Sequence, residues 1–267
     1  MATFLQLIDL YEDGTDCFVA DSPAQLAMRL FGGQVAAQAL RAGCLTVPAG
    51  RWPHSLHAYF IRPGRPDVPV RLSVARSRDG RSFSTRLITA TQHGQVILIM
   101  MASFSQYEEG PDWQPPARPE VPGPEELPAA AEMLSWFSAM ASFEIRPVAR
   151  GPAATLHPCW IRLAEPLPED PSAQACALTF MSDIGMVRGA RAPGTMHRPL
   201  SGASLDHAVW LHRPALGTDW LLLSAMPACN VGGRGLARGT LHAQDGTLVA
   251  SVSQEAILRP AGTSGIT

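Results

Sequence analysis

Two parts of the chain show the alternation of hydrophobic and polar residues that is typical of strands, and each part includes one helix-like stretch. The helix-like stretches are QVAAQALRAGCL at residues 34–45 and SAQACALTFMSDIG at residues 172–185. Turn sequences such as PGRPD, RDG and QHG separate the strand-like segments. These segments cover residues 54–61, 68–78, 82–92 and 95–106 in the first part, and residues 143–149, 157–167, 204–212, 218–230, 233–244 and 246–260 in the second.

One phrase occurs twice in the chain, as SLHAYFIRP from Ser55 and as SLDHAVWLHRP from Ser204. Each copy follows a helix-like stretch and precedes strand-like segments, which indicates two copies of one structural unit. Gly32 precedes Ser55 by 23 residues and Asp183 precedes Ser204 by 21, so this spacing predicts that Gly32 and Asp183 hold equivalent places. A helix laid on an antiparallel sheet buries the apolar surface of both, and two such units can protect each other's edge strands. The pattern therefore predicts an α+β fold with one continuous curved sheet.

A proline-rich segment separates the two parts. Seven prolines lie between Glu108 and Pro128, a density that rules out a long helix or strand. We therefore expect an N-terminal repeat at residues 1–107, a linker at 108–135, and a C-terminal repeat at 136–267.

The basic residues exclude several classes of enzyme, because all 21 of them are arginine and the chain contains no lysine. Schiff-base enzymes, Walker-type phosphate loops and protein kinases each require a lysine. Arginine still suits phosphate groups, so a phosphorylated ligand remains possible. The formal net charge of −2 gives no support to binding of nucleic acid or of an anionic membrane.

The cysteines and the N-terminal sequence indicate a reduced, cytoplasmic protein. Five scattered cysteines form no C-x-x-C pair, which favours packed thiols over disulfides or a metal site. The N-terminal residues carry acids where a signal peptide carries positive charge, and no apolar run approaches the roughly 18 residues of a membrane span.

Several motifs together resemble the acyl-CoA thioesterase II family. LFGGQVAAQAL, HSLHAYFIRPG, RDGRSFSTR and MASF lie in the first half, and FEIRPV, SDIG, DHAVWLHRP, QDGTLVAS and SQEAILR follow in the second half, in the family's order. The resemblance extends from about residue 4 to residue 260. It implies a double hot-dog fold and hydrolysis of acyl-CoA to a free fatty acid and CoA, without a metal, another cofactor or a covalent intermediate.

The same resemblance implies three catalytic residues: Asp183 in MSDIG, Ser204 in SLDH and Gln254 in VSQEA. The family usually has threonine where this chain has Ser204, which keeps the hydroxyl but loses the methyl that restricts its rotamer. Independently of the family, hydrolysis of a thioester needs a base for the water and donors for the developing oxyanion. Asp183 can act as that base, while Ser204 and Gln254 can only orient the water. Asp183 and Ser204 have plainer alternatives, as a helix cap and an ordinary strand residue, whereas Gln254 on an apolar strand needs hydrogen-bond partners if it is buried.

The substrate-binding candidates are Gly32, Gly33, His57 and Arg234. The glycines allow close approach of a ligand at a helix start, where backbone N–H groups can bind the carbonyl oxygen. Arg234, like Arg188, Arg191 and Arg238, is a candidate for the CoA phosphates, although exposed arginines often have no ligand. Asp206 and His207 in DHAVW look like a catalytic pair, but neighbours in a strand point to opposite faces of the sheet, which favours a structural role for both. Only the second half carries the polar set, so one active site per chain is expected.

Two other functions remain open at this stage. One is a hot-dog hydratase or dehydratase, which typically has a histidine beside its acid; no histidine lies beside Asp183. The other is a non-catalytic acyl-CoA binding module. No G-x-S-x-G elbow is present, which argues against a serine nucleophile. We also expect a homodimer or a higher homo-oligomer.

Overall fold

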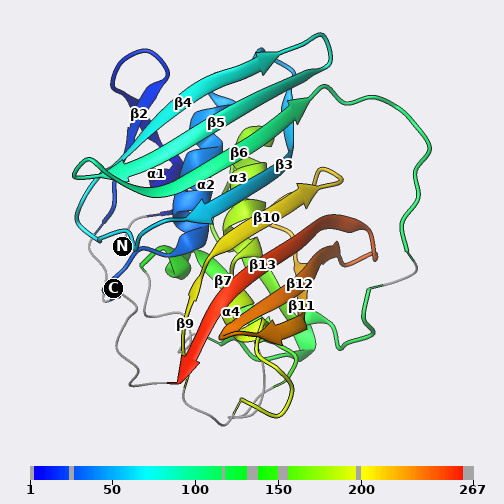
Figure 1. Cartoon of the computed structure of the whole chain (residues 1–267). Coiled ribbons are helices and arrows are strands. Elements are labelled where there is room, and N and C mark those ends of the chain that lie inside the picture. The colour runs from blue at the N-terminus through cyan, green and yellow to red at the C-terminus, as the bar shows by residue number, and fades with distance from the viewer. Residues whose placement is uncertain are drawn as a thin grey trace.

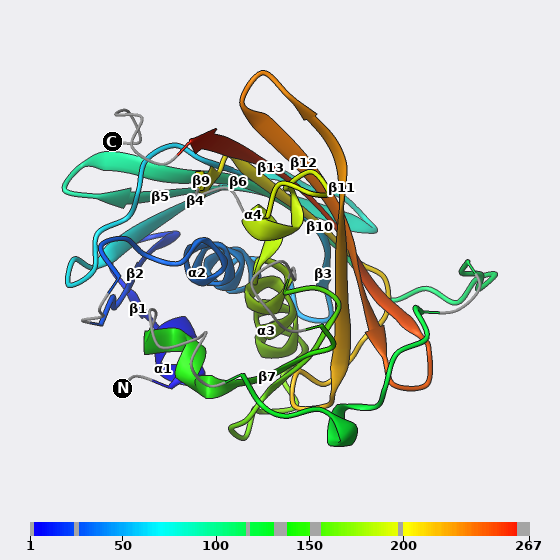
Figure 2. The ribbon, with the colours of Figure 1, turned by 90° about the horizontal axis from the view of Figure 1, so that it is seen from below.

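The computed structural model shows one strongly curved antiparallel sheet wrapped around two long helices (Figures 1 and 2). It describes residues 3–23, 27–115, 118–130, 138–149, 156–196 and 200–260. Within these residues the sheet has 13 strands, and every pair of neighbouring strands is antiparallel. The predicted α+β class and the shared sheet are confirmed.

In the first repeat two short paired strands precede the long helix and four longer strands follow it, the last three of which form a meander. Its elements are α1 (Phe4–Ile8), β1 (Leu10–Glu12), β2 (Cys17–Ala20), α2 (Gly32–Cys44), β3 (Trp52–Phe60), β4 (Val70–Asp79), β5 (Phe83–Gln92) and β6 (Gln95–Ser105). Burial alternates strictly along β5, as expected for a strand with one face on the core. The predicted helix and the four predicted strands of this half are present.

The second repeat has the same order with an insertion after its helix. Its elements are η3 (Ser138–Ser142), β7 (Phe143–Pro147), β8 (Cys159–Leu163), α3 (Pro171–Ser182), α4 (Met186–Gly189), β9 (Leu200–Ser204), β10 (Asp206–Leu211), β11 (Leu221–Val231), β12 (Arg234–Ala243) and β13 (Leu248–Pro260). The insertion comprises α4 and β9, and β9 pairs with the C-terminal end of β13. The predicted strand at 204–212 is therefore divided between the end of β9 and β10.

The strand order reveals the repeat directly. Counted outward from the central β3–β10 pair, the order is β3-β6-β5-β4-β2-β1 in the first half and β10-β13-β12-β11-β8-β7 in the second. The two halves therefore have the same strand order and extend in opposite directions from the centre. At this central seam Leu56 lies opposite Val209 and His57 opposite Ala208. The two copies of the repeated phrase are thus hydrogen-bonded to each other.

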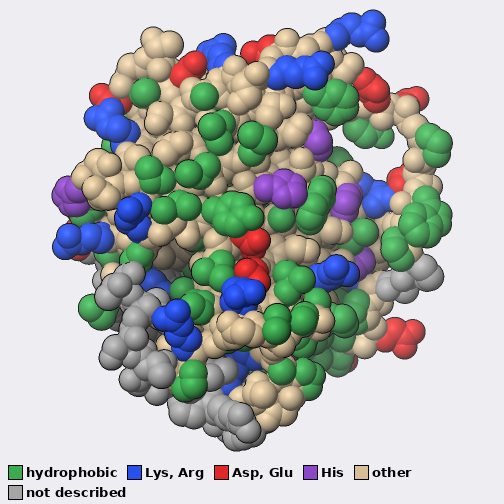
Figure 3. Space-filling model, viewed as in Figure 1, with side chains coloured by type: hydrophobic (Ala, Val, Ile, Leu, Met, Phe, Trp, Pro, Cys, Tyr) green, Lys and Arg blue, Asp and Glu red, His purple; other side chains and the backbone are tan. Residues whose placement is uncertain are grey.

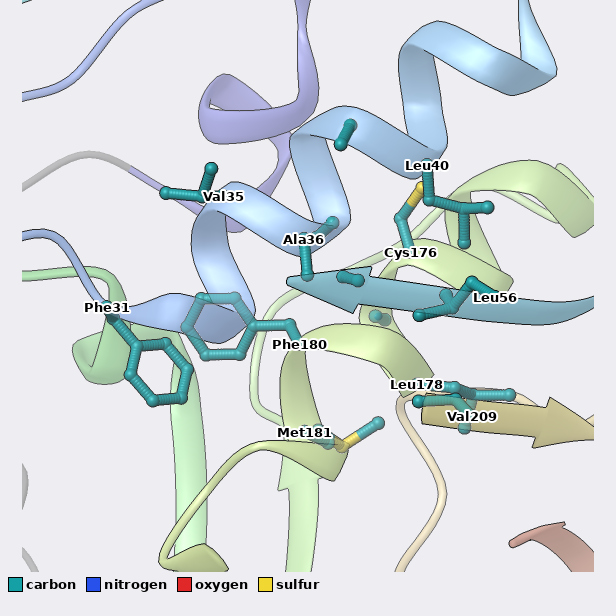
Figure 4. Packing of buried hydrophobic residues seen from close by; sticks show 14 of the residues in the cluster. Phe31, Val35, Ala36, Leu40, Leu56, Cys176, Leu178, Phe180, Met181 and Val209 are labelled. Atoms are coloured by element: carbon teal, nitrogen blue, oxygen red, sulfur yellow. The ribbon is translucent and has the colours of Figure 1, made fainter. Parts of the chain in front are cut away.

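Helices α2 and α3 fill the concave side of the sheet, and each belongs to a different repeat (Figure 2). α2 is alanine-rich, which lets it lie close to α3 and to the sheet. Leu56 of β3 and Val209 of β10 point toward these helices and meet Leu40, Cys176 and Leu178 (Figure 4). No helix in the described part of the chain is long and apolar enough to cross a membrane.

The helices correct one prediction made from spacing. Gly32 is the first residue of α2, whereas Asp183 caps the C-terminus of α3, so the two do not hold equivalent places. The residue that caps the C-terminus of α2 is Leu45. The spacing agreed only because the inserted α4 and β9 lengthen the path from α3 to β10.

The proline-rich segment packs against the second repeat. Trp160 and Trp220 form a small apolar cluster with Leu222, apart from the main core, and Val121 and Leu127 pack against it. The Trp160 indole N–H donates to the carbonyl of residue 122 at 2.8 Å. The segment also contains a short 3-10 turn, η1 (Pro124–Glu126). A side chain of the second repeat thus provides a hydrogen bond to backbone of the proline-rich segment, which belongs to no strand.

Candidate active site

A pocket of about 380 Å³ opens where the first turn of α2 meets the C-terminal end of α3. Both repeats line it, and most of the lining is apolar. Its wall includes Arg29, Leu30, Phe31, Gly32, Val35, Phe60, Arg62 and Ile97 from the first repeat, and Asp183, Gly185, Val187, Ala203, Ser204, Leu205 and Ile257 from the second.

Asp183 provides the carboxylate of this pocket. It caps the C-terminus of α3, and only 5% of its surface is exposed. Its Oδ2 accepts a hydrogen bond of 2.7 Å from the backbone N–H of Gly33, in the first turn of α2. The positive N-terminal end of one helix thus faces a carboxylate at the end of the other.

The two glycines allow this close approach. A Cβ at Gly33 would lie 2.6 Å from the carbonyl oxygen of Phe180, and a Cβ at Gly32 would lie 2.7 Å from Asp183 Oδ2. Neither distance is tolerated by real side chains. The sequence predicted the close approach of a ligand at these glycines, and what the structure shows there is the close approach of the neighbouring helix.

Gln254 and Ser204 lie beside Asp183, and Gln254 links the two by hydrogen bonds. The Gln254 amide nitrogen donates to Ser204 Oγ at 2.9 Å, and the same side chain hydrogen-bonds to Asp183. Ser204 is the last residue of β9 and lines the pocket, whereas Gln254 is completely buried in β13 behind the pocket wall. The structure therefore brings together Asp183, Ser204 and Gln254, which are far apart in the sequence.

Burial raises the pKa of Asp183 from its ordinary value of 3.8 to about 7. The Gly33 N–H, the Gln254 amide and the positive charge of Arg29 act in the opposite direction, since each favours the charged form. Burial prevails, which gives a carboxylate that takes up and releases a proton near neutral pH.

The first repeat lacks this polar set at the corresponding places. Leu45 caps α2 where Asp183 caps α3. In the first repeat, Leu56 of β3 lies opposite Ala102 of β6. In the second repeat, Ala208 of β10 lies opposite Ser253 of β13, and one residue further along this register His207 faces Gln254. The pair of His207 and Gln254 is therefore the counterpart of Leu56 and Ala102. One polar site per chain is therefore present in the described residues.

Two of the binding candidates lie away from the pocket. His57 is exposed on the outer face of the sheet, because its strand neighbours Leu56 and Ala58 point inward, and its ring meets Trp210 edge-on at 5.1 Å. Arg234 begins β12 and forms an ion pair of 2.9 Å with Glu255. Neither residue lines the pocket.

The pocket also contains residues that the sequence reasoning did not select. Arg29 and Arg62 lie in its wall, and Arg29 donates to the carbonyl of Gly202 at 2.9 Å. Arg29 lies just before α2 and Arg62 just after β3, beside motifs already recognised, and this position in the sequence could have identified them as candidates. No group of three or more His, Cys, Asp or Glu side chains suited to a metal ion is found among the residues described.

Two helix-on-sheet repeats with a single polar site between their helices define a double hot-dog protein. The models of the acyl-CoA thioesterase N-terminal domain and C-terminal domain match residues 20–105 and 114–258. The chain belongs to the acyl-CoA thioesterase family.

Individual relatives agree with this assignment. Acyl-coenzyme A thioesterase 8 of Homo sapiens is 34% identical over 259 residues, covering 87% of this chain and 81% of that protein. Acyl-CoA thioesterase 2 of Haemophilus influenzae is 33% identical over 252 residues, covering 86% and 88%. The crystal structure of the acyl-CoA thioesterase II TesB2 from Mycobacterium marinum superposes with a TM-score of 0.83 at 35% identity, covering 97% of this chain and 99% of that one.

Proposed function

We propose that the protein hydrolyses acyl-CoA thioesters to a free fatty acid and CoA. The observation that carries the proposal is the buried Asp183, held by Gly33 and Gln254 next to Ser204 at the wall of an apolar pocket. Membership of the acyl-CoA thioesterase family supports it.

In the proposed mechanism, a water molecule between Asp183 and Ser204 attacks the thioester carbonyl carbon. Asp183 accepts a proton from the water, and the C–O bond forms as the carbonyl oxygen takes up negative charge. The tetrahedral intermediate then collapses, the C–S bond breaks, and the thiolate of CoA leaves with the proton that Asp183 holds. Thiolates are weakly basic, so the leaving group needs little assistance.

The pocket wall suggests where the rest of the substrate lies. Leu30, Val35, Phe60 and Ile97 offer an apolar surface to the acyl chain. The first turn of α2, where Gly32 lines the pocket, is the place for a backbone donor to the carbonyl oxygen. Arg29 and Arg62 in the pocket wall replace Arg234 as our candidates for the CoA phosphates.

Thiol release from acyl-CoAs of chain lengths C2 to C18 tests the function, with wild type compared with Asp183→Asn. A blank without substrate corrects for the exposed Cys229. We expect turnover by wild type and a loss of at least about a hundredfold in the variant, with the fold intact by circular dichroism. Tight binding without turnover would indicate an acyl-CoA binding module, and hydration of enoyl-CoA would indicate a hydratase. Either result would reject the proposal.

We also propose that two copies pair through the outer face of the sheet. Tyr59, Ile99, Met101 and Trp210 leave between 37% and 62% of their surface exposed there, on the neighbouring strands β3, β6 and β10. Hydrophobic side chains and histidines gather in the middle of this face (Figure 3). The group lies at the β3–β10 seam, and such a central patch suits a twofold contact between copies.

A further inference from the structure

His207 is a fully buried histidine directly behind the proposed active site. It lies on β10, next to Asp206, and the two side chains point to opposite faces of the sheet. Asp206 is half-buried and accepts a hydrogen bond of 2.6 Å from the Glu255 N–H, away from the helices. His207 points inward, toward α3 and β13.

Both ring nitrogens of His207 have a partner. Nδ1 lies 2.6 Å from Oε1 of Gln254, and Nε2 lies 2.8 Å from Oγ of Ser182. Ser182 directly precedes Asp183 in the chain. The ring thus connects the end of α3 that carries the proposed base to the amide that contacts this base.

Chemistry decides which atom donates in each of these bonds. The charged carboxylate of Asp183 only accepts, so the Gln254 amide must turn its NH₂ group toward Asp183 and Ser204. Its oxygen then faces His207, which must carry a proton on Nδ1. Burial lowers the pKa of His207 to about 4, so the ring is neutral, and a proton on Nδ1 leaves Nε2 as an acceptor. The Ser182 hydroxyl lies 2.8 Å from both Nε2 and the Thr179 carbonyl oxygen, and an unprotonated Nε2 receives its one hydrogen.

We propose that His207 is a positioning residue for the reaction: its Nδ1–H holds the Gln254 amide in the one orientation that donates to Asp183 and Ser204. An amide side chain has nearly the same shape after a half-turn about its last bond, so packing alone does not select an orientation. The Ser182 hydroxyl fits this tautomer by donating to Nε2 but does not impose it, since the Thr179 carbonyl oxygen is a second acceptor at 2.8 Å. This inference rests on the proposed function.

The first repeat shows that the fold does not need these polar groups. Leu56 and Ala102 form the corresponding pair there, and both are completely buried. A buried polar network that an apolar pair replaces elsewhere in the same fold has a purpose beyond packing.

Three substitutions of His207 separate positioning from packing. In His207→Asn the amide nitrogen falls near the place of Nδ1 and still donates to Gln254. In His207→Gln it falls near Nε2 and reaches Ser182 instead, and His207→Leu reaches neither. We expect kcat within about tenfold of wild type for the asparagine variant and a loss of about a hundredfold or more for the other two, with KM changed little.

The pH profile gives a second readout. When the amide rotates, its oxygen faces Asp183 and disfavours the charged form, so the acid limb of kcat/KM moves to higher pH in His207→Leu and not in His207→Asn. The other groups that act on Asp183 are the Gly33 N–H of α2 and the charge of Arg29 before α2, and both are unchanged in these variants. Activities that follow melting temperature alone, or equal activity in all three variants, would overturn the proposal.

A measurement without substrate keeps this inference separate from the proposed function. The ¹⁵N shifts of the His207 ring, assigned by comparison with His207→Asn, are expected to show a protonated Nδ1 and an unprotonated Nε2. A wild-type ring protonated at Nε2 would overturn the positioning role, and this holds even if thiol release shows that the protein is not a thioesterase.

Discussion

Asp183 is a carboxylate held where its charge is poorly solvated. Its pKa of about 7 lies above the ordinary 3.8, so the folded protein keeps this proton at pH values where the unfolded chain has released it. Between these two pKa values the folded state binds more protons than the unfolded state. The free energy of unfolding therefore falls as the pH rises from about 4 to about 7, and the whole penalty is present above that range.

Replacement of Asp183 by asparagine should remove this penalty. We expect Asp183→Asn to raise the free energy of unfolding at pH 8 by about 1–4 kcal/mol, while the difference from wild type shrinks toward pH 4. Thermal or urea unfolding at both pH values measures it. Equal stability of the two proteins at pH 8 would show that burial does not perturb this carboxylate.

At the residue scale, the sequence was informative where a family motif and a chemical requirement coincided. Asp183, Ser204 and Gln254 were selected in this way, and the structure places them together. Ser204 in place of threonine still accepts from the Gln254 amide, so this bond needs only the hydroxyl. His57 illustrates the opposite case, since a motif does not tell which face of a strand carries a given side chain.

At the element scale, the site depends on the contact between the first turn of α2 and the last turn of α3. Gly33 lies at its centre, and a Cβ there would meet the backbone oxygen of Phe180, which cannot rotate away. The helices must separate to admit it, and the bond from the Gly33 N–H to Asp183 must then lengthen.

Gly33→Ala should therefore reduce stability and activity together. We expect a loss of about 1–3 kcal/mol in the free energy of unfolding and of at least about tenfold in kcat. Gly110→Ala is the matched control, because its added methyl meets nothing within 4 Å. Wild-type kinetics in Gly33→Ala would show that the helix contact does not set the site's geometry.

The elements found from the sequence were those in which hydrophobic residues recur at a regular spacing over a long stretch. α2, α3 and the long strands fall in this group, and their ends agree to within a few residues. Short elements such as β1, β2 and β9 were missed, because so few residues seldom show a readable hydrophobic period, although β7 and β8, with five residues each, were found. The insertion between α3 and β10 then produced the false match between Gly32 and Asp183.

At the scale of the whole molecule, the two repeats face each other across the β3–β10 seam and leave an apolar patch on the outer face. We expect a particle of at least twice 28.6 kDa by light scattering, and a monomer when Tyr59 and Met101 are both replaced by glutamate. Tyr11→Glu is the control, since Tyr11 is equally exposed but lies on β1, at the edge of the sheet. A wild-type monomer would reject this interface.

The most direct test of the central claim is the pH dependence of kcat/KM for acyl-CoA hydrolysis, measured in wild type and in Asp183→Asn. If Asp183 is the base, the wild-type value rises with pH and levels off above about pH 7, the pKa that burial gives this carboxylate. The residual activity of the variant should show no such limb. A limb of the same midpoint in both proteins, or undiminished activity in the variant, would contradict the account and assign the base to another group.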